Sequence, residues 1–147
     1  MTGSTLDVTA GTAITDSGVV TVTGVTDLSA VTDITLDSAN EFGGAVSASG
    51  TTIILNDVND IELADIDAAG NLAVTAVGSI DDGSPTALDG DVDVGGTSTL
   101  ISSGGGNITV DDTTNDFVDP VRASGEDIAL GDASDIQLAD IDATGSL

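Results

Sequence analysis

The chain has 147 residues and carries 26 acidic side chains against a single basic one, Arg122, so its formal net charge is −25. This charge argues against nucleic acid as a partner, because lysine and arginine must displace phosphate counterions, and against binding to an anionic membrane surface. The sequence has no His, Cys, Lys or Tyr, so carboxylates are the main groups left for acid–base or nucleophilic chemistry. We therefore expect a protein that is not an enzyme.

The apolar content is sufficient for a core but unusual in type. The mean hydropathy is +0.28, yet the aromatic residues are two Phe. A core assembled from Val, Ile, Leu and Ala favours strands, because β-branched side chains pack well on pleated surfaces. No apolar run approaches the ~20 residues of a membrane-spanning helix, so no membrane insertion is expected. The N-terminal residues lack the basic and apolar regions of a signal peptide, and we expect any targeting signal to lie outside this stretch.

Short segments in which apolar residues alternate with Asp, Thr or Glu follow one another from the N-terminus. This alternation predicts half-buried strands with one face inward. Such segments lie at residues 6–8, 20–22, 34–36, 53–55, 61–63 and 72–74. Gly, Asn, Asp and Ser separate them and predict turns, and no window has helical spacing. The pattern indicates an all-β fold.

The sequence contains two copies of one long unit. Residues 42–72 recur as residues 117–147, and the two segments share Ala-Ser-Gly and Leu-Ala-Asp-Ile-Asp-Ala. The offset between the copies grows from 66 to 75 along the unit, which places insertions in the second copy near residues 81–91 and 104–106. We divide one solenoid segment, 1–147, into repeat one, 6–71, and repeat two, 72–147.

A repeat of this length discriminates among the all-β architectures. A sandwich or barrel has no reason to repeat at 66–75 residues, and propeller blades repeat at about 40–50 residues with aromatic signatures that this sequence lacks. A parallel β-solenoid fits, because equivalent inward residues of successive coils stack on one another. We predict a parallel β-helix with about three coils per 66–75-residue repeat.

The repeats also predict which side chains fill the interior. Both copies hold the same apolar phase at Ile53, Leu55, Ile61, Leu63 and Leu72, and at Ile128, Leu130, Ile136, Leu138 and Leu147. Neither end of the chain resembles the caps that cover unpaired strand edges in solenoids. We therefore expect an isolated segment to be weakly stable or to associate end to end.

Two Asp-Ile-Asp triplets at corresponding places form the candidate metal site. Asp65 and Asp67 in repeat one, and Asp140 and Asp142 in repeat two, could bind Ca²⁺, a hard cation that takes oxygen ligands. The same residues could instead bond turn amides and face water. We favour that interpretation, because the calcium-binding nonapeptide G-G-x-G-x-D is absent. No cofactor is expected, with Ca²⁺ as the alternative, and Arg122 is expected to pair with a neighbouring Asp.

The pattern L-x-V-T-A-G-x-A-I-T-D-S-G, followed by V-T-V-T-G and D-I-T-L-D-x-x-N-x-F-G-G-A-V, stands at residues 6–18, 20–24 and 33–46. It resembles the repeats of filamentous haemagglutinin-like and autotransporter-type adhesins, which are very large bacterial surface proteins. The resemblance implies a right-handed parallel β-helix that forms a stalk or shaft, either secreted or at the cell surface. A looser copy covers residues 72–121, where residues 118–120 depart from the Gly-Gly-Ala of residues 43–45.

The sequence therefore predicts a structural shaft segment of a secreted or surface-displayed, adhesin-like repeat protein. Its partners would be neighbouring repeats of the same chain, with host-surface or matrix ligands contacted by other regions. Two alternatives stay open. One is a calcium-rigidified extender repeat, and the other is a fragment of a polysaccharide-active β-helix enzyme that uses a carboxylate pair.

Overall fold

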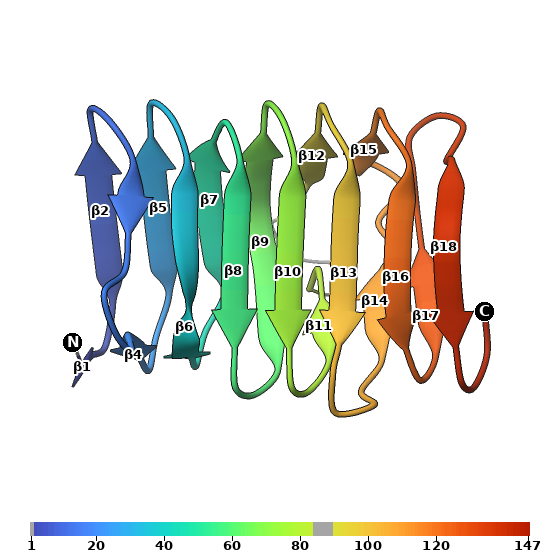
Figure 1. Cartoon of the computed structure of the whole chain (residues 1–147), viewed down its shortest axis with the longest axis horizontal. Helices are drawn as coiled ribbons and strands as arrows, with labels where there is room; N and C mark the ends of the chain where they lie inside the picture. The colour runs from blue at the N-terminus through green and yellow to red at the C-terminus, as the bar shows by residue number, and fades with distance from the viewer. Residues whose placement is uncertain (1, 84–89) are drawn as a thin grey trace.

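The chain folds into a stack of coils in which every strand pair is parallel, and Figure 1 shows these coils following one another along a single axis. This computed structural model describes residues 2–83 and 90–147. Within those ranges there is no helix, and so none that could cross a membrane, and the strands make about seven turns of a β-solenoid. The predicted all-β parallel solenoid is confirmed.

The strands are short, and they coincide with the alternating segments of the sequence. Their bounds are β1 Thr2–Gly3, β2 Leu6–Ala10, β3 Ile14–Thr15, β4 Thr21–Val22, β5 Thr26–Ala30, β6 Ile34–Phe42, β7 Val46–Gly50, β8 Ile53–Asp57, β9 Ile61–Ala68, β10 Leu72–Ala76, β11 Ile80–Asp81, β12 Val92–Val94, β13 Ser98–Ser102, β14 Ile108–Val110, β15 Asp116–Phe117, β16 Val121–Gly125, β17 Ile128–Leu130 and β18 Leu138–Ala143.

Each coil contributes strands to three faces. The first face contains β2, β5, β7, the end of β9, β12 and β15. The second face contains β3, the start of β6, β8, β10, β13, β16 and β18. The third face contains β1, β4, the end of β6, the start of β9, β11, β14 and β17. In Figure 1 the first face runs upward behind the second, which runs downward as the chain advances to the right, so the solenoid is right-handed.

The interior consists of apolar columns that run along the axis. One column on the second face is Ile14, Ile34, Ile53, Leu72, Ser98 and Val121, each paired with the next. Adjacent strands lie about 4.8 Å apart, so each of these side chains contacts its counterparts in the coils above and below. Leu63 is buried and the preceding Glu62 is exposed, which confirms the predicted register.

The last coil departs from the predicted interior. Ile53, Leu55, Ile61, Leu63 and Leu72 are all buried, as expected. Among their counterparts Ile128 is buried, Leu130 and Ile136 are partly buried, and Leu138 and Leu147 are 50 % and 78 % exposed. The prediction that these last two residues are interior is wrong in this structure, because burial in a solenoid requires a further coil on top and none covers them here.

The second repeat is rotated by one face relative to the first. Repeat one comprises eight strands, β2 to β9, of which β6 and β9 bend round a corner and serve two faces each. Repeat one therefore has ten strand segments, whereas three coils with one segment on each of three faces would have nine. As a result β7 lies on the first face, whereas its counterpart β16 lies on the second, where it pairs with β13. About three coils per repeat is confirmed, and the extra third of a coil produces the rotation.

The regions where the two copies differ lie at turns. The turn at residues 118–120 keeps the backbone bonds of residues 43–45: Val118 N–H donates to Val94 at 3.1 Å, as Gly43 N–H does to Val22 at 2.7 Å. The glycine run 104–106 connects β13 to β14, and Gly105 has a φ of 80°, which glycine adopts without steric cost. Of the insertion expected near residues 81–91, residues 84–89 lie outside the described part of the chain.

Candidate functional site

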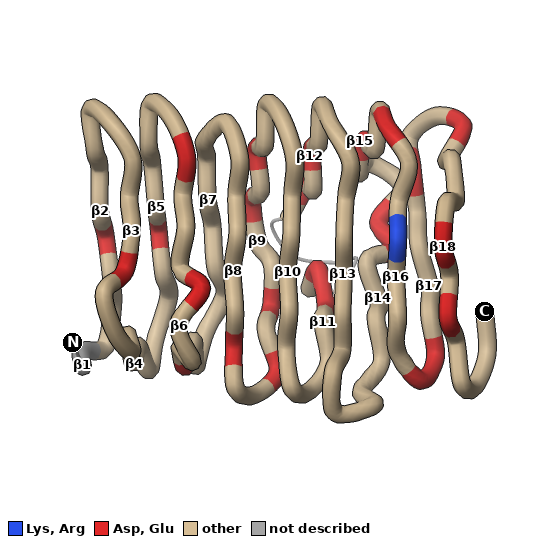
Figure 2. The backbone as a smooth tube through the Cα atoms, viewed as in Figure 1, with Lys and Arg blue, Asp and Glu red and all other residues tan. Residues whose placement is uncertain are grey.

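A column of carboxylates stands on the outside of the first face. Asp67 of β9, Asp93 of β12 and Asp116 of β15 are paired in register, one above the other. Strands about 4.8 Å apart hold these like charges close together. Partial burial raises the pKa of Asp93, and the neighbouring carboxylates, Asp91 first among them, raise it further. Figure 2 shows acidic segments on β9 and β12.

The same column is polar but uncharged in the earlier coils. Below Asp67 lie Ser49, Ser29 and Thr9, each paired with the next, and the Ser49 hydroxyl lies 3.5 Å from an Asp67 carboxylate oxygen. This outward column of the first face therefore changes from hydroxyls to carboxylates along the axis, at the point where repeat one ends, whereas the neighbouring column already carries carboxylates at Asp7 and Asp27 in the first coils.

The four candidate calcium ligands lie on two different faces. Asp67 is exposed on β9 in the carboxylate column and Asp65 is exposed two residues earlier on the same strand, whereas Asp140 and Asp142 are exposed on β18 of the second face. The two triplets also lie several coils apart along the axis, so the structure does not bring them together. Among the described residues, no group of three or more Asp or Glu side chains is arranged to hold a metal ion. Asp140 is instead paired in register with Arg122 of β16.

A buried polar pair occupies one corner of the solenoid in repeat one. Asn40, fully buried, donates a 2.9 Å hydrogen bond from its amide to Asp16 and accepts one of 2.8 Å from the Val20 N–H. The Asp16 carboxylate also accepts the Ser38 N–H at 3.1 Å. A bend in the chain at this corner leaves backbone groups without ladder partners, and these side chains satisfy them.

Repeat two contains the same hydrogen-bond arrangement, at the next corner of the solenoid. Asn115 donates to Asp82 at 2.9 Å and accepts the Val92 N–H at 2.9 Å. The Asp82 carboxylate also accepts the Asp112 N–H at 3.1 Å. Burial raises the pKa of Asp82 above its ordinary value, although the hydrogen bond from Asn115 acts in the opposite direction. The sequence did not predict this pair, because Asp and Asn between strands indicate turns.

A second carboxylate lies at the corner in each repeat, buried at Asp57 and partly buried at Asp132. Asp57 accepts the Phe42 N–H at 3.0 Å and the Asn59 N–H at 2.8 Å, and burial raises its pKa. Its counterpart Asp132 accepts the Phe117 N–H at 3.3 Å. The recurrence of Asp16, Asn40 and Asp57 as Asp82, Asn115 and Asp132 was the sequence signal that could have revealed this network.

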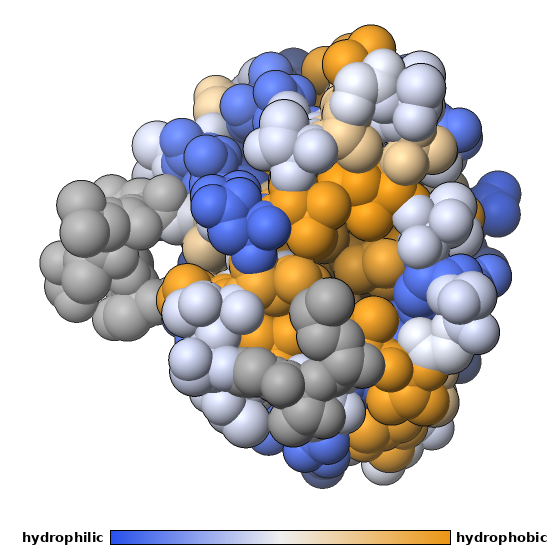
Figure 3. Space-filling view, turned by 90° about the vertical axis from the view of Figure 1, so that its left-hand side faces the viewer, coloured by the Kyte–Doolittle hydropathy of each residue, from blue (hydrophilic) through white to orange (hydrophobic). Residues whose placement is uncertain are grey.

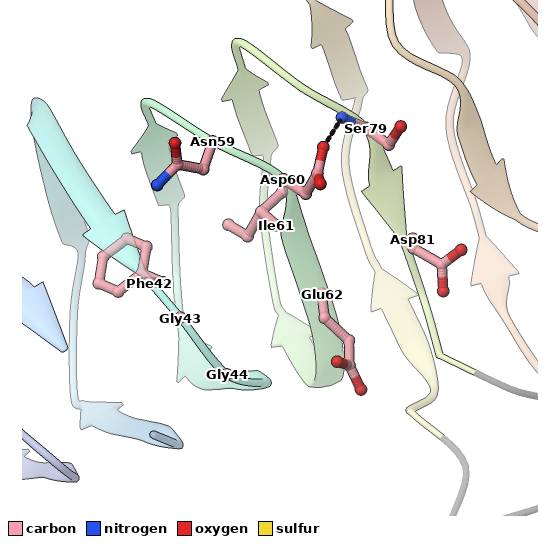
Figure 4. A pocket seen from close by; sticks show the side chains of 9 residues that line it. All are labelled: Phe42, Gly43, Gly44, Asn59, Asp60, Ile61, Glu62, Ser79 and Asp81. Atoms are coloured by element: carbon pink, nitrogen blue, oxygen red, sulfur yellow. Dashed lines mark hydrogen bonds between the residues drawn. The ribbon is translucent and has the colours of Figure 1, made fainter. Parts of the chain in front are cut away.

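An open hollow lies where the ladder of the third face is interrupted. Figure 4 shows its lining, which includes Phe42 and Gly43 on one side and Ile61 and Glu62 on the other. The hollow has a volume of about 470 Å³. Among the described residues the end of β6 does not pair with the start of β9 here, because the Phe42 N–H bonds Asp57 instead. Asp60 and Glu62 are exposed at the rim. The hollow is a consequence of the corner network.

Among the comparisons with known proteins, a match was found to a family of repeats. A family model described as repeats of unknown function (DUF5649) matches residues 1–49 and 50–124. The chain belongs to this family. The second match ends at Ser124, one residue before Gly125, the counterpart of Gly50, so it spans one repeat in a different phase from our division. No curated protein and no solved structure matches the chain.

Proposed function

We propose that the chain is a shaft segment of a large bacterial repeat protein of the adhesin type, and that it has no catalytic role of its own. The observation that carries this proposal is the continuity of the backbone ladder across the boundary between the two repeats. β8, in repeat one, and β10, in repeat two, are paired over five residues without a shift in register. Bending at that boundary would break hydrogen bonds, so the two repeats behave as one rigid body.

The side-chain distribution also supports a shaft. Apolar side chains of both repeats form one contiguous core, while most acidic side chains of the strands are exposed. Figure 2 shows where the acidic residues lie along the backbone. Negative charge on the outer surface keeps a long structure soluble and opposes lateral association. Among the described residues, the terminal strands β2, β17 and β18 have no partner strand on their outer edges, which directs any association along the axis.

The location outside the cell and the adhesin context rest on the resemblance of residues 6–18, 20–24 and 33–46 to bacterial surface repeats. Exposure of the parent protein on intact cells tests this part of the proposal. An antibody against this segment should label intact cells or the medium. Labelling only after the cells are broken would contradict it.

The length of tandem arrays of this chain tests whether it forms a shaft. Tandem arrays of two, three and four copies, joined so that Leu6 of each copy follows Ser146 of the copy before it, should form straight rods. The rod length should increase by about 32 Å per added copy, which is about 16 Å per repeat, from strand spacing alone. Small-angle scattering and electron microscopy measure this increment, and a flexible string of separate bodies would overturn the proposal.

One observation favours a calcium-rigidified extender as the second candidate. The carboxylate column of Asp67, Asp93 and Asp116 places like charges in register, and a divalent cation would offset their repulsion. The calcium titration described in the Discussion decides between the two candidates. Hydrolysis of polysaccharides is the remaining alternative, and an assay for released reducing sugar tests it.

A further inference from the structure

An apolar hollow of about 410 Å³ lies open at the C-terminal end of the stack, along the free edge of β17. Its lining includes Ile128, Leu130, Ile136, Leu138 and Leu147. Four of these residues have counterparts in repeat one, at Ile53, Leu55, Ile61 and Leu63, and Leu147 corresponds to Leu72, the first residue of repeat two. The two sets have the same side chains but differ in exposure, so the hollow shows what the end of a repeat looks like when nothing covers it.

The counterpart surface in repeat one is covered by the first coil of repeat two. β10 pairs with β8 along its whole length, and β11 and β12 pair with the two halves of β9. This cover reduces the exposure of Leu63 to 0 %, against 50 % for its counterpart Leu138. Leu72, the first residue of the cover, is in turn covered by β13 and is 1 % exposed, whereas its counterpart Leu147 is 78 % exposed. The structure therefore contains one occupied example of this interface and one vacant example.

The N-terminal coil has the residues that an occupant needs. β2 is the repeat-one counterpart of β10, and its inward residues Leu6, Val8 and Ala10 are only partly buried. Figure 3 shows apolar side chains gathered in the middle of this end of the stack. The two ends of the chain are thus complementary in the same way as the two sides of the internal boundary.

We propose that the hollow along β17 binds the N-terminal coil of a second copy of this unit, which docks rotated by one face, so that its β2 extends the third face. This inference rests on the proposed shaft function and adds the partner, the face and the register. The pairing of β10 with β8 fixes that register: Leu6, Asp7 and Val8 of the second copy lie opposite Ile128, Ala129 and Leu130.

Ser146, next to the C-terminus, already makes one backbone contact of the kind that this interface requires. The Ile128 N–H donates to the Ser146 carbonyl at 2.8 Å, as the Ile53 N–H donates to the Asn71 carbonyl at 2.9 Å. Leu147 consequently stands where Leu72 stands at the internal boundary. In a continuous array, Leu6 of the second copy takes the place of Leu147, and no linker is required.

Cysteine pairs in a two-copy tandem chain, residues 1–146 followed by residues 6–147, test the register. The sequence has no cysteine, so Ala129→Cys in the first copy with Asp7→Cys in the second introduces one pair at exposed positions. Neighbouring strands hold Cα atoms within disulfide range. The matched control is Ile54→Cys with Ala73→Cys, a pair that is in register at the internal boundary. We expect both disulfides to form to a similar extent under mild oxidation.

A third pair distinguishes the rotated arrangement from an unrotated one. Asp140→Cys in the first copy lies on β18, the edge of the second face, and it should not crosslink with Asp7→Cys of the second copy. A crosslink to position 140 instead of position 129 in a chain that still forms a straight rod would overturn this inference and leave the shaft function intact. No crosslink at either position in a jointed, flexible chain would overturn both.

A substitution without cysteine gives a second readout. Leu130→Ala should lower the melting temperature of the single chain only slightly, since Leu130 is partly exposed there. In the first copy of the tandem chain, the same substitution should lower the melting temperature as much as Leu55→Ala does, because a second copy buries Leu130. Equal, small effects in both chains would mean that the hollow stays uncovered.

Discussion

Asn115 donates a 2.9 Å hydrogen bond to the carboxylate of Asp82, one coil earlier in the stack, and this pair repeats the contact between Asn40 and Asp16. Both asparagines are fully buried, and each also accepts a backbone N–H at a corner. The side chains replace the ladder bonds that the backbone loses where it turns from one face to the next. Polar residues in the interior are thus part of the repeat itself.

Removal of one member of this network should destabilise the fold. Asn115→Ala leaves both the Asp82 carboxylate and the Val92 N–H without this partner in a buried place, and a loss of about 2–3 kcal/mol is expected. Urea denaturation monitored by circular dichroism measures the change. Thr113→Ala, an exposed position in the same turn, is the control and should change the stability little. An equal effect of the two substitutions would show that the buried pair adds nothing.

Acidification should stabilise this protein. Burial raises the pKa values of Asp57, Asp82 and Asp93 above the ordinary 3.8, so the folded chain binds protons at these sites more tightly than the unfolded chain. The free energy of unfolding therefore decreases as the pH rises through the raised values and is greatest below the ordinary value. We expect the melting temperature to increase as the pH is lowered from 7 toward about 4.

Asp93→Asn tests the cause of this pH dependence. It removes one of the raised carboxyl groups at an exposed position, so the melting temperature should be higher at pH 7 and should change less with pH. Asp7→Asn, an exposed carboxylate of β2 on the same face, is the matched control. A melting temperature that decreases steadily on acidification in all three proteins would contradict the prediction.

Salt should stabilise the fold through screening. The Debye length decreases from about 30 Å at 0.01 M to about 10 Å at 0.1 M, which weakens repulsion among exposed carboxylates. The melting temperature should increase over that range of NaCl, and Ca²⁺ at matched ionic strength should add little. If Asp65 and Asp67 bind calcium, millimolar Ca²⁺ should raise the melting temperature further, and Asp67→Asn should remove part of that gain. A melting temperature that responds to neither salt would refute the electrostatic account.

The same substitution at corresponding positions of the two repeats should lower the free energy of unfolding by different amounts. Leu63→Ala removes a fully buried side chain and should destabilise the fold by about 2–5 kcal/mol. Leu138→Ala, at the corresponding position of repeat two, removes a side chain that is half exposed, so its cost should be well below that of Leu63→Ala. Denaturant unfolding of both variants provides the comparison. Equal costs would indicate that the last coil is covered in solution, for instance by another copy.

A buried hydroxyl offers a stabilising substitution. Thr26 is 1 % exposed, and among the described residues its Oγ1 has no hydrogen-bond partner. The hydroxyl of Ser98, its counterpart in repeat two, is also buried and has no partner among those residues. Burial of an unpartnered hydroxyl costs about 1–3 kcal/mol in protein mutational data. Thr26→Val keeps the shape and should increase the free energy of unfolding by about 1 kcal/mol. Thr9→Val at an exposed position is the control, and a destabilised Thr26→Val variant would reveal a partner for the hydroxyl in solution.

Alternation and repetition were sufficient to predict the architecture. Apolar residues at alternate positions, as at Ile61 and Leu63, define the inward side of each strand, and recurrence of the same phase in both copies requires stacking. The rotation by one face was not predictable in this way. It depends on whether β6 and β9 turn a corner inside one continuous strand, and local residue patterns do not mark where one face ends.

The polar network and the exposed last coil were missed for two different physical reasons. Asp57 occurs in a turn-like context, and its burial depends on backbone groups of Phe42 in the preceding coil, which a local window does not include. The exposure of Leu138 depends on whether another coil follows. Burial in a stacked fold is a property of neighbours along the axis, so identical residues differ in environment according to position in the stack.

Rotation by one face per repeat also determines the straightness of a long array. The three faces differ in their corners and bulges, as at the interrupted ladder between β6 and β9, and any small inequality in rise between faces would curve the stack toward one side. If every repeat started on the same face, these curvatures would add up and the array would bend into an arc. Because each repeat starts one face further round, the bend of one unit points in a different direction from the next, and three successive units cancel it.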